Sequence, residues 1–172
     1  MIFYLGLHKD FFKEKSYSEA FPAHMPIHYP PVGNQADENL WGVAEHTDYG
    51  MLTLLLQDDV GGLQVQTKAG NWIDAPPVDG TFVVNLGDML EVWANGAFTA
   101  RPHRVRAPKE KDRYSVAFFF NPNLKTIVST INHDNALIDI DPSLAKNRKK
   151  LEMDLPFEYG DYYAYKYLGQ FY

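Results

Sequence analysis

Alternation of apolar and polar residues dominates the middle of the chain and predicts short β-strands. Eight segments carry this pattern, and turn signals rich in Gly, Pro and Asp separate them. Eight short strands at this spacing predict a mainly β fold, in which two sheets close into a jelly roll through Greek-key connections. The predicted strands are Met25–Tyr29, Gly42–His46, Met51–Leu56, Leu63–Gln66, Trp72–Ala75, Thr81–Leu86, His103–Arg106 and Tyr114–Phe120.

The two ends of the chain show helical patterns instead. Residues 10–20 have helical spacing, and Asp141-Pro142 has the signature of a helix N-cap followed by proline at the first helical position. A final aromatic helix is expected to pack on the sheet through one face. That face would carry Tyr162, Tyr165, Leu168 and Tyr172.

These patterns divide the chain into three parts. We predict a partial N-terminal helical segment at residues 1–24, a β core at residues 25–125 and a C-terminal helical extension at residues 126–172. The apolar pattern is already under way at Met1–Leu7, from which we expect an upstream segment. Without such a segment, one face of the larger sheet would lack a cover.

Composition and charge narrow the function classes. The chain has 172 residues, of which 45% are apolar and 15% aromatic, as in a single globular domain. The absence of cysteine excludes disulfides, thiolate zinc sites and cysteine nucleophiles. The net charge is -6 and no basic stripe is present, so no nucleic-acid partner is expected. No apolar run is long enough for a membrane span or a signal peptide, so we expect a cytoplasmic protein.

His46 and Asp48 are the first candidates for chemistry. They lie two residues apart at the end of a predicted strand, so both side chains leave the sheet on the same side. Taken alone, the pair also fits a hydrogen-bonded contact in a turn. Among the other histidines, only His103 lies in a later predicted strand that can cross the jelly roll to the same place. Two imidazoles and one carboxylate form the facial triad that binds Fe(II) and leaves adjacent coordination positions open.

Arg113 and Ser115 follow in another strand-like segment. Their spacing of two residues puts the guanidinium and the hydroxyl on one face. A guanidinium matches a carboxylate bidentately, and a hydroxyl adds a further hydrogen bond. If that face turns into the barrel, a bound anion would account for the buried charge. A surface position on the strand is the alternative for Arg113.

In this order, the candidate residues resemble the isopenicillin N synthase-like family of Fe(II)/2-oxoglutarate-dependent dioxygenases. The stretches HTDYGMLTLLLQDDVGGLQV, NLGDMLEVWANG, PHRV and RYSVAFFFNP carry the resemblance, which runs from about Met25 to Asn123. The stretch PFEYGDYYAYKYL adds a weaker similarity. The resemblance implies a double-stranded β-helix in which His46, Asp48 and His103 hold Fe(II).

The resemblance also implies a cosubstrate site and a reaction. Arg113 and Ser115, together with Tyr29, would bind 2-oxoglutarate. The protein would be a non-haem iron oxygenase that takes O2 and a small organic substrate, with ascorbate as a possible reductant. Succinate and CO2 would be released, and hydroxylation is the expected outcome, with desaturation or ring closure as variants.

Other interpretations stay open at this point. An iron oxidase or oxygenase of the same fold would use Arg113 and Ser115 for a substrate carboxylate in place of 2-oxoglutarate. A truncated, inactive jelly-roll binding module is a second alternative. Tyr29 also fits a core position with a satisfied hydroxyl. Asp88, which follows Gly87, is expected to be a turn or cap residue.

Overall fold

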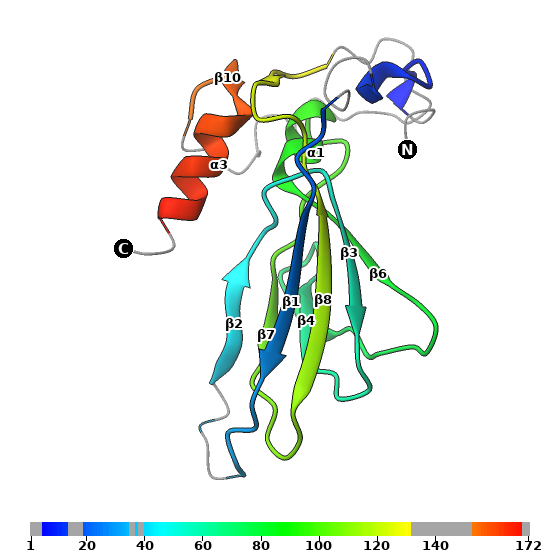
Figure 1. Ribbon diagram of the computed structural model, residues 1–172. Helices are drawn as coiled ribbons and strands as arrows, with labels where there is room; N and C mark the ends of the chain where they lie inside the picture. Colours follow the sequence, from blue (N-terminus) through cyan, green and yellow to red (C-terminus); the bar gives the residue numbers. More distant parts are fainter. Residues whose placement is uncertain (1–4, 14–18, 35–36, 38–39, 132–152, 170–172) are drawn as a thin grey trace.

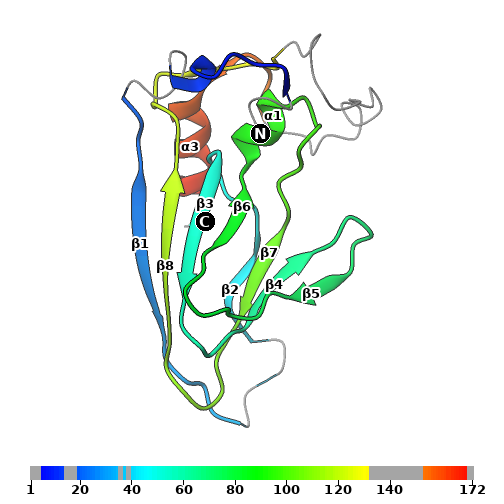
Figure 2. The ribbon, with the colours of Figure 1, turned by 90° about the vertical axis from the view of Figure 1, so that its right-hand side faces the viewer.

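The computed structural model describes residues 5–13, 19–34, 37, 40–131 and 153–169. Two four-stranded antiparallel sheets face each other (Figure 1, Figure 2), which confirms the predicted jelly-roll class. The larger sheet has the spatial order β1 (Ala23–Tyr29), β8 (Arg113–Phe120), β3 (Leu52–Gln57) and β6 (Val83–Leu86). The smaller sheet has the order β2 (Trp41–His46), β7 (His103–Arg106), β4 (Leu63–Gln66) and β5 (Trp72–Asp74).

All eight predicted strands are present, with ends that differ from the prediction by at most two residues. Turn chemistry explains this agreement. Gly70, between β4 and β5, has a φ of 86°, and Gly80, before β6, has a φ of 70°. This left-handed region is readily adopted by glycine and rarely by other residues, so these positions end one strand before the next begins.

Helical segments gather at one end of the barrel. The short helix α1 (Asp88–Trp93) directly follows β6, and a two-stranded sheet joins β9 (Ile127–Val128) to β10 (Phe157–Glu158). Helix α3 (Tyr159–Leu168) continues from β10 and stands beside this end of the barrel (Figure 1). The elements share a buried cluster that includes Met89, Leu90, Val92, Trp93, Val128, Phe157, Tyr159 and Tyr162.

The predicted packing face of the last helix is wrong. Tyr162 is buried as expected, but Tyr165 is 47% exposed and Leu168 is 57% exposed. The buried residues are Tyr159 and Tyr162, because the Tyr162 hydroxyl donates a hydrogen bond of 2.6 Å to the buried Asp88 carboxylate. This polar contact, rather than the aromatic spacing alone, sets the rotation of the helix.

Several other helical predictions lie outside the described residues. They concern Tyr172, Asp141-Pro142 and residues 14–18 of the helix expected at residues 10–20. Among the residues that the structure does describe, no helix has both the length and the apolar character needed to cross a membrane.

The outer face of the larger sheet is apolar and exposed. Alternation along β3 sends Leu55 toward the smaller sheet and leaves Leu54 (36% exposed) and Leu56 (45% exposed) outside. The strand register places Leu54 opposite Val84 and Leu56 opposite Val116, so the exposed side chains adjoin one another. These side chains form an exposed apolar patch in the described part of the chain.

A double substitution on this face should reduce self-association. We expect the variant Leu56→Thr/Val116→Thr to be more monodisperse than the unmodified chain, because contiguous exposed apolar area drives proteins together. Threonine keeps a high strand propensity, so the unfolding free energy should change little. Light scattering coupled to size-exclusion chromatography measures the effect. Ile73→Thr, at a 54% exposed position on β5, is the control and should leave the association unchanged.

Candidate metal and cosubstrate site

Three metal-ligand candidates from different parts of the chain meet at one end of the two sheets. Antiparallel pairing of β2 with β7 places His46 opposite His103, and their ring centroids are 4.2 Å apart. Asp48 lies just beyond β2, with its Oδ1 atom 3.7 Å from His46 Nε2 and 3.6 Å from His103 Nε2. The structure therefore brings together the ligand set that the sequence predicts, with all three ligand atoms within 4.8 Å of one another.

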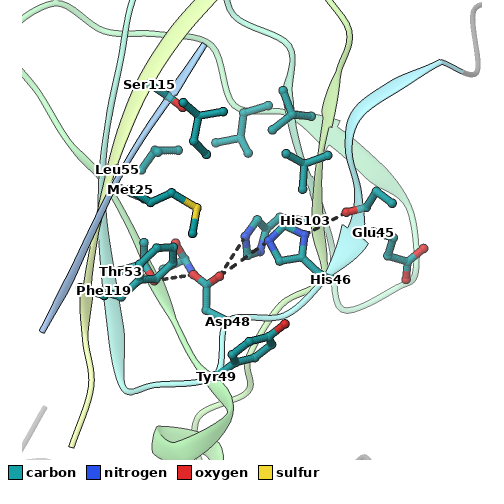
Figure 3. Close-up of a pocket in the computed structure, with 18 of the residues that line it drawn as sticks. Met25, Glu45, His46, Asp48, Tyr49, Thr53, Leu55, His103, Ser115 and Phe119 are labelled. Carbon is teal, nitrogen blue, oxygen red and sulfur yellow. Dashed lines mark hydrogen bonds and ion pairs between the residues drawn. The ribbon is translucent and has the colours of Figure 1, made fainter. Parts of the chain in front are cut away.

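Backbone hydrogen bonds fix the orientation of both imidazoles. His46 Nδ1 lies 2.9 Å from the Ala44 carbonyl oxygen, and His103 Nδ1 lies 3.1 Å from the Arg101 carbonyl oxygen. A carbonyl only accepts, so Nδ1 carries the proton and Nε2 keeps its lone pair. Both Nε2 atoms face Asp48 Oδ1 (Figure 3). The rings are thus held in the tautomer that a metal requires.

Two neutral side chains orient the carboxylate. Thr53 Oγ1 and Asn85 Nδ2 both donate hydrogen bonds to Asp48 Oδ2, the latter at 2.6 Å. Thr53 and Asn85 are direct partners in the pairing of β3 with β6, and both side chains line the cavity between the sheets. With Oδ2 occupied, Oδ1 remains available as a single ligand atom. Neither residue was predicted from the sequence pattern.

The loop that follows Asp48 is held by backbone hydrogen bonds from the start of α1. The Asp88 backbone N–H donates to the Asp48 carbonyl at 2.8 Å, and the Met89 N–H donates to the Gly50 carbonyl at 3.0 Å. A Cβ at Gly87 would overlap the Gly50 backbone, so only glycine allows this approach. Asp88 was expected to be a turn or cap residue; it is instead the first residue of α1 after the N-cap Gly87, and its carboxylate accepts the hydrogen bond from Tyr162 of α3.

The local environment keeps one imidazole neutral. Burial lowers the pKa of His46 below its usual value, and the neighbouring His103 lowers it further. Hydrogen bonding to Ala44 and the charge of Asp48 oppose this shift without reversing it. The neutral ring is the form that ligates a metal, so burial favours the metal-ready state near neutral pH.

Arg113 is fully buried and only partly paired. Its Nε donates to the Gly61 carbonyl at 2.6 Å and Nη2 donates to Gln57 Oε1 at 3.2 Å, while Nη1 has no hydrogen-bond partner. Ser115 Oγ, two residues along β8, is also buried without a partner. No ion pair joins Arg113 to a carboxylate among the described residues. A buried cation and a neighbouring hydroxyl with unused hydrogen-bonding capacity fit a carboxylate ligand.

Tyr29 lies beside the guanidinium. The residue is 6% exposed, and the Arg113 guanidinium carbon lies 4.7 Å from the centroid of its ring, within cation–π range. β1 and β8 pair Tyr29 directly with Arg113. A Cβ at Gly42 would lie only 2.7 Å from Tyr29 Cδ1, so this glycine leaves room for the ring. Both predicted uses of Tyr29, as a core residue and as a cosubstrate contact, are compatible with this position.

A cavity of about 570 Å³ is lined both by the metal-ligand candidates and by Arg113 and Ser115. It lies between the sheets and is lined by alternate residues of β1 and β8 together with residues from β2, β3, β6 and β7. Figure 3 shows Ser115 at one end and Tyr49 at the other, with His46 and Asp48 between them. An apolar cluster of Tyr29, Leu63 and Val105 surrounds the Arg113 end.

Removing the amide that orients Asp48 should weaken metal binding. We expect Asn85→Ala to lower Fe(II) affinity by about 10- to 100-fold, because residues that orient a ligand commonly have effects of this size. Anaerobic titration with a competing chelator measures the affinity. Val84→Ala, at the adjacent exposed position of β6, is the matched control and should bind Fe(II) like the unmodified chain. An Asn85→Ala affinity equal to that of the control would show that the hydrogen bond does not orient the ligand.

Comparison with known proteins agrees with this geometry. Residues 17–122 match the family model of the 2OG-Fe(II) oxygenase superfamily. A probable iron/ascorbate oxidoreductase of Dictyostelium discoideum is 41% identical over 141 residues, which cover 74% of this chain and 39% of that protein. A homoarginine-6-hydroxylase of Glycine max is 47% identical over 111 residues, which cover 62% of this chain and 34% of that protein.

The structural comparison extends over nearly the whole chain. A full-length Neurospora crassa protein, crystallised in complex with alpha-KG and thymine, aligns with a TM-score of 0.78 at 32% identity. The alignment covers 98% of this chain and 49% of that one, so the chain spans about half of the structure that it matches. It spans 39% and 34% of the two relatives named above. On these matches the chain belongs to the 2OG-Fe(II) oxygenase superfamily.

Proposed function

We propose that the chain is the catalytic region of a non-haem Fe(II) and 2-oxoglutarate-dependent oxygenase that hydroxylates a small organic molecule. The observation that carries this proposal is the presence of two incomplete sites in one cavity. One is the His46, Asp48 and His103 cluster, and the other is the buried Arg113 and Ser115 pair with unused donors. Residues 25–125 would form the catalytic core, flanked by residues 1–24 and 126–172.

The metal site would use one atom from each ligand. His46 Nε2, His103 Nε2 and Asp48 Oδ1 all face the same point, and their remaining polar atoms are occupied by hydrogen bonds. Nitrogen and oxygen donors without sulfur suit Fe(II), and three ligands leave adjacent positions open for other molecules. These hydrogen bonds would fix the geometry of the ligands before any metal binds.

The cosubstrate site would use Arg113 and Ser115. Arg113 Nη1 and Ser115 Oγ would donate to the distal carboxylate of 2-oxoglutarate, which supplies the counter-charge that the buried guanidinium lacks. Tyr29 would line the same end and keep the guanidinium in place through its ring. The apolar cluster at this end lowers the local polarity, which would strengthen the charge interaction.

When bound, iron would supply the oxidising chemistry. 2-Oxoglutarate and O2 would be converted into succinate and CO2 while a C–H bond of the substrate is oxidised. The chain holds the reactants in position between the two sheets. Among proteins similar to this chain, one is named for hydroxylation of homoarginine and another was crystallised with thymine. We propose a small organic substrate of similar size for this chain, with ascorbate as reductant.

Cosubstrate turnover tests the proposal. The chain is loaded anaerobically with Fe(II), given 2-oxoglutarate, ascorbate and O2, and succinate is measured across a panel of small molecules. We expect succinate release that depends on Fe(II) and rises with a suitable substrate. Fe(II) binding without 2-oxoglutarate binding would instead favour an iron oxidase in which Arg113 and Ser115 hold another carboxylate. Failure to bind Fe(II) would favour an inactive binding module.

A further inference from the structure

The cavity has two chemically different ends, which the pairing of β1 with β8 defines. At one end Tyr29 is opposite Arg113, and at the other end Ala23 is opposite Phe119. At about 3.3 Å per residue, the six steps from Arg113 to Phe119 span roughly 20 Å. The proposed cosubstrate occupies the Arg113 end, so the end near Phe119 and Tyr49 is left for the substrate.

An aromatic wall bounds this second end. Tyr49, which follows the ligand Asp48, and Tyr163 and Tyr167 from α3 all line the cavity. The rings of Tyr163 and Tyr167 are stacked with centroids 6.1 Å apart and an interplanar angle of 10°. Tyr49 meets Tyr163 edge to face at 6.2 Å. We call these three residues the tyrosine wall.

Hydrogen bonds connect the helix that carries Tyr163 and Tyr167 to the segment that carries Asp48. Tyr162, next to Tyr163 in α3, donates its hydroxyl to the buried Asp88 carboxylate at 2.6 Å. The Asp88 N–H in turn bonds to the carbonyl of Asp48 at 2.8 Å. Helix α3 is therefore positioned relative to Asp48 through two consecutive hydrogen bonds, and the wall does not depend on apolar contacts alone.

Charge is scarce at this end of the cavity. Among the described lining residues, apart from the three metal-ligand candidates and Arg113, the only acidic or basic side chain is that of Glu45. Figure 3 shows the Glu45 carboxylate directed away from His46 and Asp48. Lys166 is near the wall, with Nζ 5.9 Å from the centroid of the Tyr49 ring, but it does not line the cavity. Thr53 and Asn85 are already bonded to Asp48, and the Asn121 amide is a further neutral polar group in the lining.

From the tyrosine wall and the lack of opposing charge, we propose that the substrate is an uncharged molecule with a flat aromatic or heteroaromatic ring that packs against Tyr163 and Tyr167. This inference rests on the proposed function, because it assigns the other end of the cavity to 2-oxoglutarate. Rings of this kind gain from offset or edge-to-face contact with tyrosine, whereas a charged group would lose hydration without an ion-pair partner at this end, since Glu45 is directed away.

A matched pair of probes tests the shape of the site. 2-Naphthol and decahydro-2-naphthol carry the same hydroxyl on a flat and on a saturated ring system. The full chain is loaded with Zn(II) and saturating 2-oxoglutarate; 2-naphthol binding is followed by its own fluorescence, and the saturated probe is added as competitor. We expect 2-naphthol to bind more tightly, and 2-naphthoate and 2-naphthylmethylamine to bind more weakly than 2-naphthol. Equal binding of the flat and saturated probes, or tighter binding of a charged one, would overturn the proposal.

Variants of the tyrosine wall locate the binding. We expect Tyr163→Leu and Tyr167→Leu each to weaken 2-naphthol binding by roughly three- to tenfold, the size expected for one lost aromatic contact. Tyr165→Leu, on the same helix but outside the cavity lining, is the control and should bind like the unmodified chain. Since Tyr167 is 46% exposed, its variant should fold normally even if Tyr163→Leu does not. Unchanged binding in a folded wall variant would contradict the inference.

The same samples separate this inference from the proposed function. Binding of 2-oxoglutarate is measured independently by calorimetry in the presence of Zn(II). If 2-oxoglutarate binds and 2-naphthol does not, the substrate class is wrong while the proposed function stands. If 2-oxoglutarate does not bind but the tyrosine wall variants still weaken 2-naphthol, the proposed function is wrong and the ring-binding site stands.

Discussion

Alanine at His46, Asp48 or His103 is expected to abolish stoichiometric Fe(II) binding. Each residue contributes one of three ligand atoms that lie within 4.8 Å of one another, and two ligands hold Fe(II) poorly. Anaerobic equilibrium dialysis followed by iron analysis measures the loss. Turnover of 2-oxoglutarate should disappear in the same variants, because the cosubstrate reacts only at the metal.

A variant can lose iron because a metal ligand is missing or because the chain no longer folds, and controls must distinguish the two causes. Asp48→Ala leaves Thr53 and Asn85 without their acceptor, so Asp48→Asn is the better test of the charge. Glu45→Ala, beside His46 but with its carboxylate directed away from the cluster, is the control and should keep its iron. If all three ligand variants retained full iron content and activity, the site would be assigned to the wrong residues.

Strand periodicity was sufficient to find the metal-ligand candidates, because their chemistry is rare and their spacing is regular. His46 and Asp48 lie two residues apart, and a single later strand histidine, His103, completes the cluster. The jelly-roll class followed from the same periodicity. Glycine-rich turns separate the strands clearly enough to count them.

Residues that depend on strand register were not found in this way. Thr53 and Asn85 are common neutral residues, and only the pairing of β3 with β6 brings them to the same carboxylate. The packing face of α3 was predicted from aromatic spacing, whereas the structure places Tyr162 against Asp88, 74 residues away. Contacts between segments that are distant in the sequence decide such features, and the local pattern of apolar and polar residues does not predict those contacts.

The unpaired donor of Arg113 leads to the second large expected effect. Arg113→Lys should weaken 2-oxoglutarate binding at least about tenfold, or roughly 1.4 kcal/mol, because lysine keeps the charge but loses the two-pronged geometry. Ser115→Ala removes a single hydrogen bond and should cost less, on the order of 1 kcal/mol. Iron binding should be unaffected in both variants, since neither residue contributes a metal ligand atom.

Stability offers an independent readout of the same contact. Without an anion, the Arg113 guanidinium is buried with no described carboxylate partner, which is an unfavourable state for a charge. A ligand present at 100 times its Kd raises stability by about 2.7 kcal/mol, so 2-oxoglutarate should raise the melting temperature of the metal-loaded chain. Arg113→Met should remove this increase, whereas Arg106→Met, at an exposed position of β7, should retain it. If 2-oxoglutarate stabilised Arg113→Met and the unmodified chain equally, Arg113 would serve a different anion, and its unused donor would point to the carboxylate of a substrate.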